Sequence, residues 1–95
     1  MKRKVLQLKN AFRDDIHYSY LLISSYVEKD AEAYVIICKM KCPNGILRSS
    51  KVKIYTSYKS ACRFFKKLYY NLATPSNLVY VAEDDFQIQA LSEMI

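Results

Sequence analysis

Apolar and polar residues alternate over three stretches in the first half of the chain, and this spacing predicts β-strands. The first stretch, about residues 16–27, reads IHYSYLLISSYV and is rich in β-branched and aromatic residues. The second, about 33–41, and the third, about 46–56, follow after short polar segments. Between them, Asn44-Gly45 is the dipeptide that tolerates the positive φ angles of a tight hairpin turn. We therefore predict a three-stranded antiparallel meander.

The first predicted strand becomes apolar on both faces at its middle. Tyr18, Tyr20 and Leu22 alternate with a second set that changes from polar to apolar: His17, Ser19, Leu21 and Ile23. A strand with this pattern lies centrally in its sheet or is covered on both sides.

The next segment, SYKSACRFFKKLYYNLATP at residues 57–75, has the three- and four-residue spacing of an amphipathic helix. Thr56 or Ser57 is the candidate N-cap, and Thr74-Pro75 is the stop, so the helix covers about residues 57–73. One arc is apolar and is expected to pack on the sheet: Tyr58, Ala61, Cys62, Phe65, Leu68, Tyr69 and Leu72. The opposite arc carries Lys59, Arg63, Lys66 and Tyr70, with Lys67 beside them and Phe64 at the border.

Both ends of the chain fit more than one element. Residues 76–86 fit a short strand or a second helix, and Thr74 before Pro75 favours the helix because proline suits the first helical position. Residues 1–13 fit a flexible segment or a short extra element. The predicted fold class is α+β, one small domain over residues 1–95, in which one amphipathic helix packs on the meander.

Composition agrees with one compact, non-membrane domain. Of the 95 residues, 52% are apolar, which is too many for a disordered chain, and the length suits a single core. No run approaches the roughly 18 to 20 apolar residues of a membrane-spanning helix. The N-terminal residues lack the apolar centre of a signal peptide. We expect a cytoplasmic protein.

The titratable and nucleophilic residues form no recognisable catalytic or metal-binding pattern. Three cysteines and His17 could supply zinc ligands, but Cys38 and Cys42 lie at a predicted strand end while Cys62 lies on the apolar helix face. Adjacent carboxylates occur at residues 14–15 and 84–85, where neighbouring side chains point apart and a solvated turn or terminus is expected. With one histidine and one glycine, we predict no enzyme, no metal, no cofactor and no small-molecule substrate.

The order of segments resembles a known family. DDIHYSYLL, a further strand, a charged third strand leading into KIYTSYKSACRFFKKL, and then TPSNLVYVAEDDF are similar to a family of small Firmicutes proteins of unknown function, over about residues 14–87. The chain departs from that pattern in its basic helix and at Asn77, where the family often has histidine. The resemblance implies a compact sheet-and-helix domain of bacterial origin, and it transfers no site.

Charge distribution supplies the remaining functional signal. The formal net charge is +6, and the helix segment carries basic residues but no acidic residue, so like charges repel along one face. The preferred hypothesis is a protein-interaction module, either a homodimer, an adaptor or an inhibitor, that uses a basic and aromatic helix face. The alternative is a nucleic-acid-binding protein that contacts phosphates through the same stripe. A third interpretation has Glu83, Asp84 and Asp85 neutralise the stripe. The candidate partner-binding residues are Lys59, Arg63, Lys66, Lys67, Tyr70, Lys51, Lys53 and Tyr55.

Overall fold

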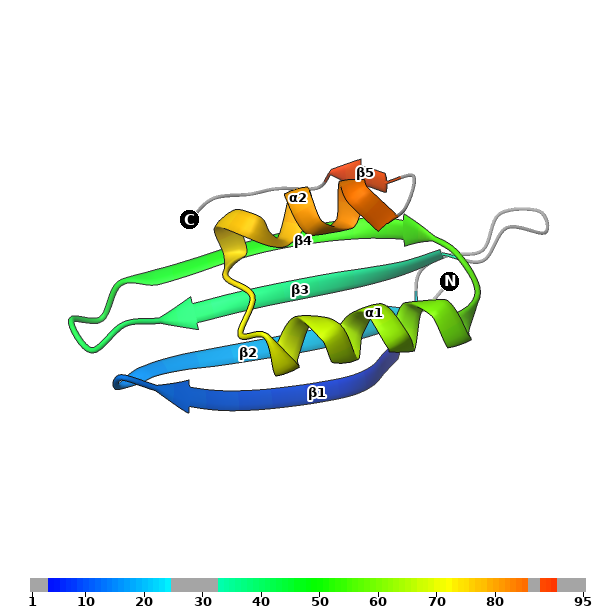
Figure 1. Cartoon of the computed structure of the whole chain (residues 1–95). Helices are drawn as coiled ribbons and strands as arrows, with labels where there is room; N and C mark the ends of the chain where they lie inside the picture. Colours follow the sequence, from blue (N-terminus) through cyan, green and yellow to red (C-terminus); the bar gives the residue numbers. More distant parts are fainter. Residues whose placement is uncertain (1–3, 25–32, 86–87, 91–95) are drawn as a thin grey trace.

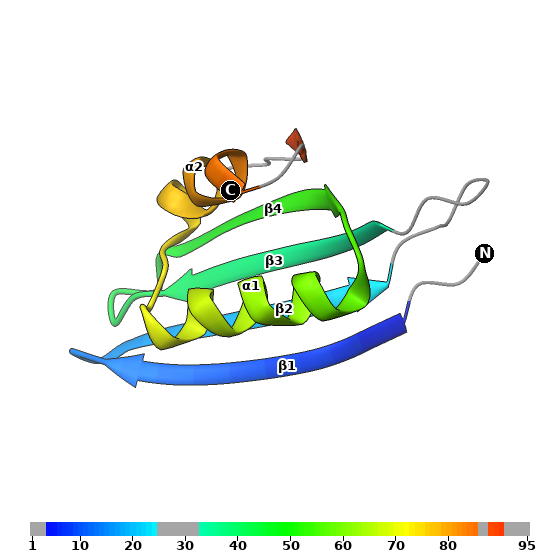
Figure 2. The same cartoon turned by 45° about the vertical axis from the view of Figure 1, so that its right-hand side comes forward.

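The fold is a single antiparallel sheet with both helices packed on one of its faces (Figures 1 and 2). The computed structural model describes residues 4–24, 33–85 and 88–90. The strands follow one another in the order β1-β2-β3-β4-β5, each antiparallel to its neighbour. The elements are β1 (Lys4–Arg13), β2 (Ile16–Ser24), β3 (Ala33–Lys41), β4 (Leu47–Tyr55), α1 (Tyr58–Tyr70), α2 (Pro75–Asp85) and β5 (Ile88–Ala90).

The α+β class is confirmed, and the three predicted strands are present as β2, β3 and β4, but the sheet has two further strands. β1 is a ten-residue strand that pairs with β2 over its whole length, and the three-residue β5 pairs with β4 at the other edge. β1 was ambiguous from the sequence because its alternation also fits a helical face. In the structure, its pairing with β2 shows that β1 is a strand.

Two different turns close the β1–β2 and β3–β4 hairpins, and both lie where the sequence predicted a turn, but the backbone conformation of the second differs from the prediction. Asp14 and Asp15 have φ of 53° and 65° and form the two-residue connection between β1 and β2, where positive φ at both positions matches the strand twist. Gly45 has φ of 90°, whereas Asn44 has a negative φ. The Gly45 N–H donates to the Cys42 carbonyl at 2.9 Å, as in a turn followed by one left-handed residue. The prediction of positive φ at both Asn44 and Gly45 is wrong.

The core lies between the sheet and the two helices. Its sheet side comes from alternate residues of three strands: Tyr18, Tyr20, Leu22, Tyr34, Ile36, Cys38, Val52 and Ile54. Its helix side comes from Ala61, Phe64, Phe65, Leu68, Leu78 and Ala82. The predicted apolar arc of α1 is largely right, but Phe64 is only 3% exposed and belongs to the core, while Tyr58 is 44% exposed. The buried arc is therefore rotated toward Phe64.

Capping explains where each helix begins. Ser57 is the N-cap of α1, and its hydroxyl oxygen accepts a hydrogen bond from the Ser60 N–H at 3.2 Å. At α2, the backbone N–H of Thr74 donates to the Asn77 amide oxygen at 2.8 Å, which is one half of a capping box. The prediction that favoured a helix after Thr74 is confirmed. Neither helix in the described part of the chain has the length and apolar composition that crossing a membrane requires.

Candidate interaction surfaces

The eight predicted partner-binding residues lie on opposite sides of the sheet. Five belong to α1, on the side that the helices cover. The other three, Lys51, Lys53 and Tyr55, alternate along β4 with Val52 and Ile54, which are fully buried in the core. Their side chains therefore leave the opposite face of the sheet. The structure does not join the eight residues into one stripe.

The α1 part of the predicted site is an exposed basic surface with one prominent aromatic ring. Lys59, Arg63, Lys66 and Lys67 are all exposed, as predicted. The ammonium nitrogen of Lys66 lies 5.6 Å from the centroid of the Tyr70 ring, and Tyr70 is 68% exposed. Along Tyr58–Tyr70, α1 exposes these charges and the rings of Tyr58 and Tyr70, but no aliphatic side chain of that helix is exposed, so it offers no apolar group around which an interface core could form.

The opposite face of the sheet, here called the open sheet face, is the face of β1–β4 that neither helix covers (Figure 2). Strand register groups apolar side chains on it in two adjacent rows. The first row is Val5, Ile23 and Val35, and the second is Leu8, Leu21 and Ile37. Directly opposite residues on neighbouring strands have Cβ atoms about 5 Å apart, so the six side chains are contiguous. We call them the apolar block.

The apolar block is partly exposed, and most so at its β1 side. Val5 is 52% exposed and Leu8 is 54% exposed, whereas Leu21, Ile23 and Ile37 are half-buried and Val35 is buried. This surface could not be predicted while residues 1–13 were not assigned to a strand, because β1 supplies its most exposed residues. A signal was available in β2, whose two faces both become apolar, but that pattern was interpreted as burial on both sides. In the structure, helices cover only one of the two faces of β2.

Lysines border the block on the β3 and β4 side. Lys53 lies opposite Val35 and Lys51 opposite Ile37, while Lys39 and Lys41 continue along β3 beyond Ile37. We call these four residues the lysine rim. The Lys53 ammonium lies 5.5 Å from the centroid of the Tyr55 ring. Among the residues that the structure describes, no carboxylate side chain belongs to the rows that form this face.

Polar side chains occupy the end of the open sheet face near the β1–β2 turn. The His17 Nε2 and the Ser19 hydroxyl both lie 2.9 Å from the amide oxygen of Asn10. An amide oxygen only accepts, so the Ser19 hydroxyl donates its proton to Asn10. The His17 Nε2 lies farther from that hydroxyl, at 3.4 Å, and the closer contact of each group is to Asn10. Phe12 stacks on the His17 ring with 4.5 Å between centroids. The cluster is a hydrogen-bonded end of the sheet and lacks the arrangement of an activated nucleophile.

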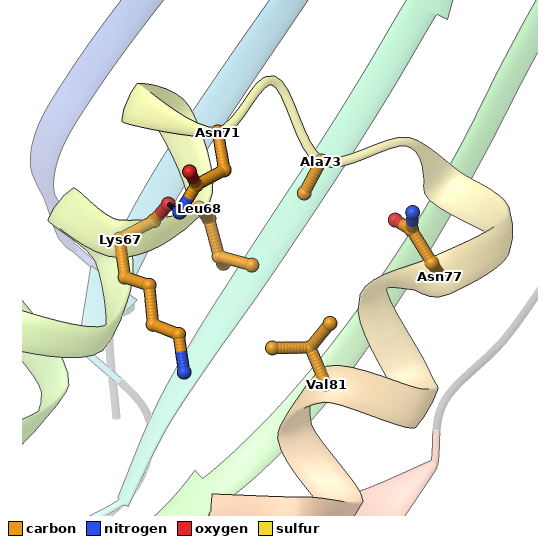
Figure 3. A pocket seen from close by; sticks show the side chains of 6 residues that line it. All are labelled: Lys67, Leu68, Asn71, Ala73, Asn77 and Val81. Atoms are coloured by element: carbon orange, nitrogen blue, oxygen red, sulfur yellow. Dashed lines mark hydrogen bonds between the residues drawn. The ribbon is translucent and has the colours of Figure 1, made fainter.

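A shallow hollow lies between the end of α1 and α2 (Figure 3). Its volume is about 130 Å³, and it is lined by Lys67, Leu68, Asn71, Ala73, Asn77 and Val81. Figure 3 places Asn71 and Asn77 on either side of it, but both amides already serve the helix ends. Asn71 Nδ2 donates to the Lys67 carbonyl, and the Asn77 oxygen accepts from the Thr74 N–H, each at 2.8 Å. Small-molecule sites are typically about 300 to 1,000 Å³, so this hollow is a poor ligand site.

Three buried side chains attach the α1–α2 connection to the sheet. The Tyr20 hydroxyl and the Cys38 thiol both donate to the Ala73 carbonyl, at 2.8 and 3.3 Å, and the Ser50 hydroxyl donates to the Pro75 carbonyl at 2.7 Å. Burial raises the pKa of Cys38 to about 12 and also raises the pKa of Tyr20, because a charged thiolate or phenolate would lose its hydration. Both groups are therefore neutral structural donors at physiological pH.

The cysteines lie apart in the fold. Cys38 is in the core, Cys42 is in the β3–β4 turn, and Cys62 on α1 accepts a hydrogen bond from Gln7 Nε2 at 3.3 Å. In the described ranges, no three histidine, cysteine or acidic side chains come together where they could hold one metal ion.

Comparisons of the chain with protein-family models, curated proteins and solved structures find no match. The resemblance to a Firmicutes family stays a prediction. Functional inference therefore depends on the surfaces described above.

Proposed function

We propose that this chain is a non-enzymatic protein-interaction module and that its main contact surface is the open sheet face. The observation that carries the proposal is the apolar block, which leaves Val5 and Leu8 more than half exposed beside the lysine rim. Protein interfaces commonly have an apolar centre and a polar border, and this face has both parts in adjacent positions. The α1 surface offers a polar border but no apolar centre.

The chemistry of the block favours a protein partner over a nucleic acid. The four lysines of the rim could contact phosphates, which supports nucleic-acid binding as the second candidate function. Single-stranded nucleic acids also need flat aromatic rings on which bases can stack. All six residues of the block are aliphatic, and the two exposed rings of this face, Phe12 and Tyr55, lie at opposite ends of the sheet, where they cannot form one stacking platform. Val, Leu and Ile side chains fit the apolar side chains of a protein better than they fit bases.

The proposal can be tested by comparing one charge-changing variant on each surface. Val5→Glu combined with Leu8→Glu alters the block at exposed positions, and Arg63→Glu, Lys66→Glu and Lys67→Glu alter α1. Each protein is first checked for an unchanged circular dichroism spectrum and then used, immobilised, to capture partners from cell lysate treated with nuclease. We expect the β1 variant to lose partners that the parent and the α1 variant both retain.

Two results would contradict the proposal. If the α1 variant loses the partners and the β1 variant keeps them, α1 is the contact surface, as the sequence first suggested. If nuclease treatment removes all binding from the parent protein, the partner is nucleic acid, because protein contacts survive the loss of bridging DNA or RNA.

A further inference from the structure

The lysine rim gives the open sheet face one sign of charge. Four ammonium groups follow β3 and β4 beside the apolar block, and no carboxylate joins them in the described rows of that face. Within the described ranges, Lys39, Lys41 and Lys51 have no ion-pair partner. A partner that covers the apolar block must place some of its own side chains next to the ammonium groups of the lysine rim. Acidic groups would complement them, and basic groups would be repelled.

A second copy of this chain complements the face poorly. If two open sheet faces met, eight lysines would be gathered around one interface without a carboxylate from the described rows of either copy. The block is also small, because it has six residues, one of them buried, whereas a stable interface uses about 20 to 30 residues on each side. These two facts favour a short segment of another protein over self-association.

The dimensions of the face fit a helix lying along the strands. From Val35 to Lys41, β3 spans roughly 20 Å at about 3.4 Å per residue. At 1.5 Å per residue, about 14 helical residues cover the same length. On the other side of this sheet, α1 shows that a helix with one apolar arc packs on these strands. The backbone groups of β2 and β3 are already paired, so a ligand on this face meets side chains only.

We propose that the open sheet face binds an acidic amphipathic helix of another protein. Its apolar residues cover the apolar block, and the carboxylates along one flank face Lys39, Lys41, Lys51 and Lys53. This inference rests on the proposed function, because it names the partner chemistry of the same surface.

Two synthetic peptides of about 14 residues provide the test. They share the same leucine positions and differ only in the polar flank, which is glutamate in one and lysine in the other. Binding of each fluorescently labelled peptide to the full chain is measured by anisotropy at low and moderate salt. We expect the glutamate peptide to bind and to weaken as salt rises, and the lysine peptide to bind about tenfold or more weakly.

A rim variant separates the charge inference from the proposed function. Lys39→Glu, Lys51→Glu and Lys53→Glu together should reverse the preference, so that the lysine peptide binds better. The matched control, Arg63→Glu, Lys66→Glu and Lys67→Glu on α1, makes the same change in net charge and should behave as the parent does. If both peptides bind the parent equally and Val5→Glu with Leu8→Glu abolishes both, the surface is a docking site but the acidic partner is wrong.

Other outcomes overturn the inference directly. Concentration-dependent dimerisation in analytical ultracentrifugation that Val5→Glu with Leu8→Glu abolishes would make the occupant a second copy of the chain. Binding of a single-stranded oligonucleotide that the rim variant abolishes would make it a nucleic acid. If neither peptide binds the parent, or if the α1 control loses binding as fully as the rim variant, the open sheet face is not the site and both proposals fail.

Discussion

Ser50 and Ser49 are adjacent residues whose side chains have opposite environments. The Ser50 hydroxyl is 2% exposed and donates to the Pro75 carbonyl at 2.7 Å, where α2 begins. Ser49 lies on the open sheet face, half-buried and opposite Lys39. The two serines show how strand alternation assigns one residue to the core and the next to a surface.

We expect Ser50→Ala to lower the free energy of unfolding by about 1 kcal/mol, because a short buried hydrogen bond is lost. Ser49→Ala is the matched control and should change it by less than about 0.5 kcal/mol. Urea unfolding followed by circular dichroism measures both. Equal effects of the two substitutions would mean that the bond to Pro75 contributes nothing to stability.

At the scale of elements, the two hairpin turns make different demands on their residues. Gly45 has φ of 90° and open space where a side chain would project, so any substitution there is opposed by backbone conformation alone. Asp14 and Asp15 adopt positive φ without glycine, in the turn that joins β1 to β2.

We expect Gly45→Val to destabilise the fold by about 1 to 3 kcal/mol, since a β-branched residue is strained at this φ. Pro43→Ala in the same turn should cost less than about 0.5 kcal/mol, because Pro43 is exposed and has no N–H to lose. Thermal midpoints of the two variants provide the measurement. A well-tolerated valine would show that the turn relaxes to a different conformation.

These elements also show how far the sequence determined the fold. The alternation in β2 to β4 and the spacing in α1 predicted those elements with bounds close to the observed ones. β1 could not be assigned, because a pattern such as Val5, Leu8 and Phe12 fits either a helical face or a strand with a bulge. At Asp14–Asp15 a solvated turn or terminus was expected and a turn is found, but its role as a hairpin with positive φ at both residues could not be predicted while β1 was unassigned.

The candidate site was less predictable than the fold, because it depends on the whole molecule. The sequence identified Lys51, Lys53 and Tyr55 as surface residues, but it joined them to α1 by their shared charge. Only the register across β1, β2 and β3 shows that Leu8, Leu21 and Ile37 lie side by side. Contacts between strands depend on pairing, which a single sequence leaves open.

The stability of the whole domain should decrease in alkaline solution. Burial raises the pKa of Cys38 from 9.0 to about 12, so above pH 9 the unfolded chain loses a proton that the folded chain keeps. That difference favours unfolding progressively between pH 9 and about 12, and the raised pKa of Tyr20 acts in the same direction.

We therefore expect the free energy of unfolding to fall between pH 9 and about pH 12, and to fall less steeply in Cys38→Ala, which lacks the thiol. Urea titrations of both proteins across this range measure the slope. Parallel pH profiles for the parent and the variant would show that Cys38 ionises equally in the folded and unfolded states.

The attachment of the α1–α2 connection has a consequence for how the chain folds. Its three donors, Tyr20, Cys38 and Ser50, come from three different strands, so all three are in place only when β2, β3 and β4 are aligned side by side. A one-residue slip of β3 would turn Cys38 to the other face and leave the Ala73 carbonyl with one donor fewer. Docking of the helices thus selects the native alignment of the sheet, and a chain with a misaligned strand would keep its helices undocked until that strand had re-paired.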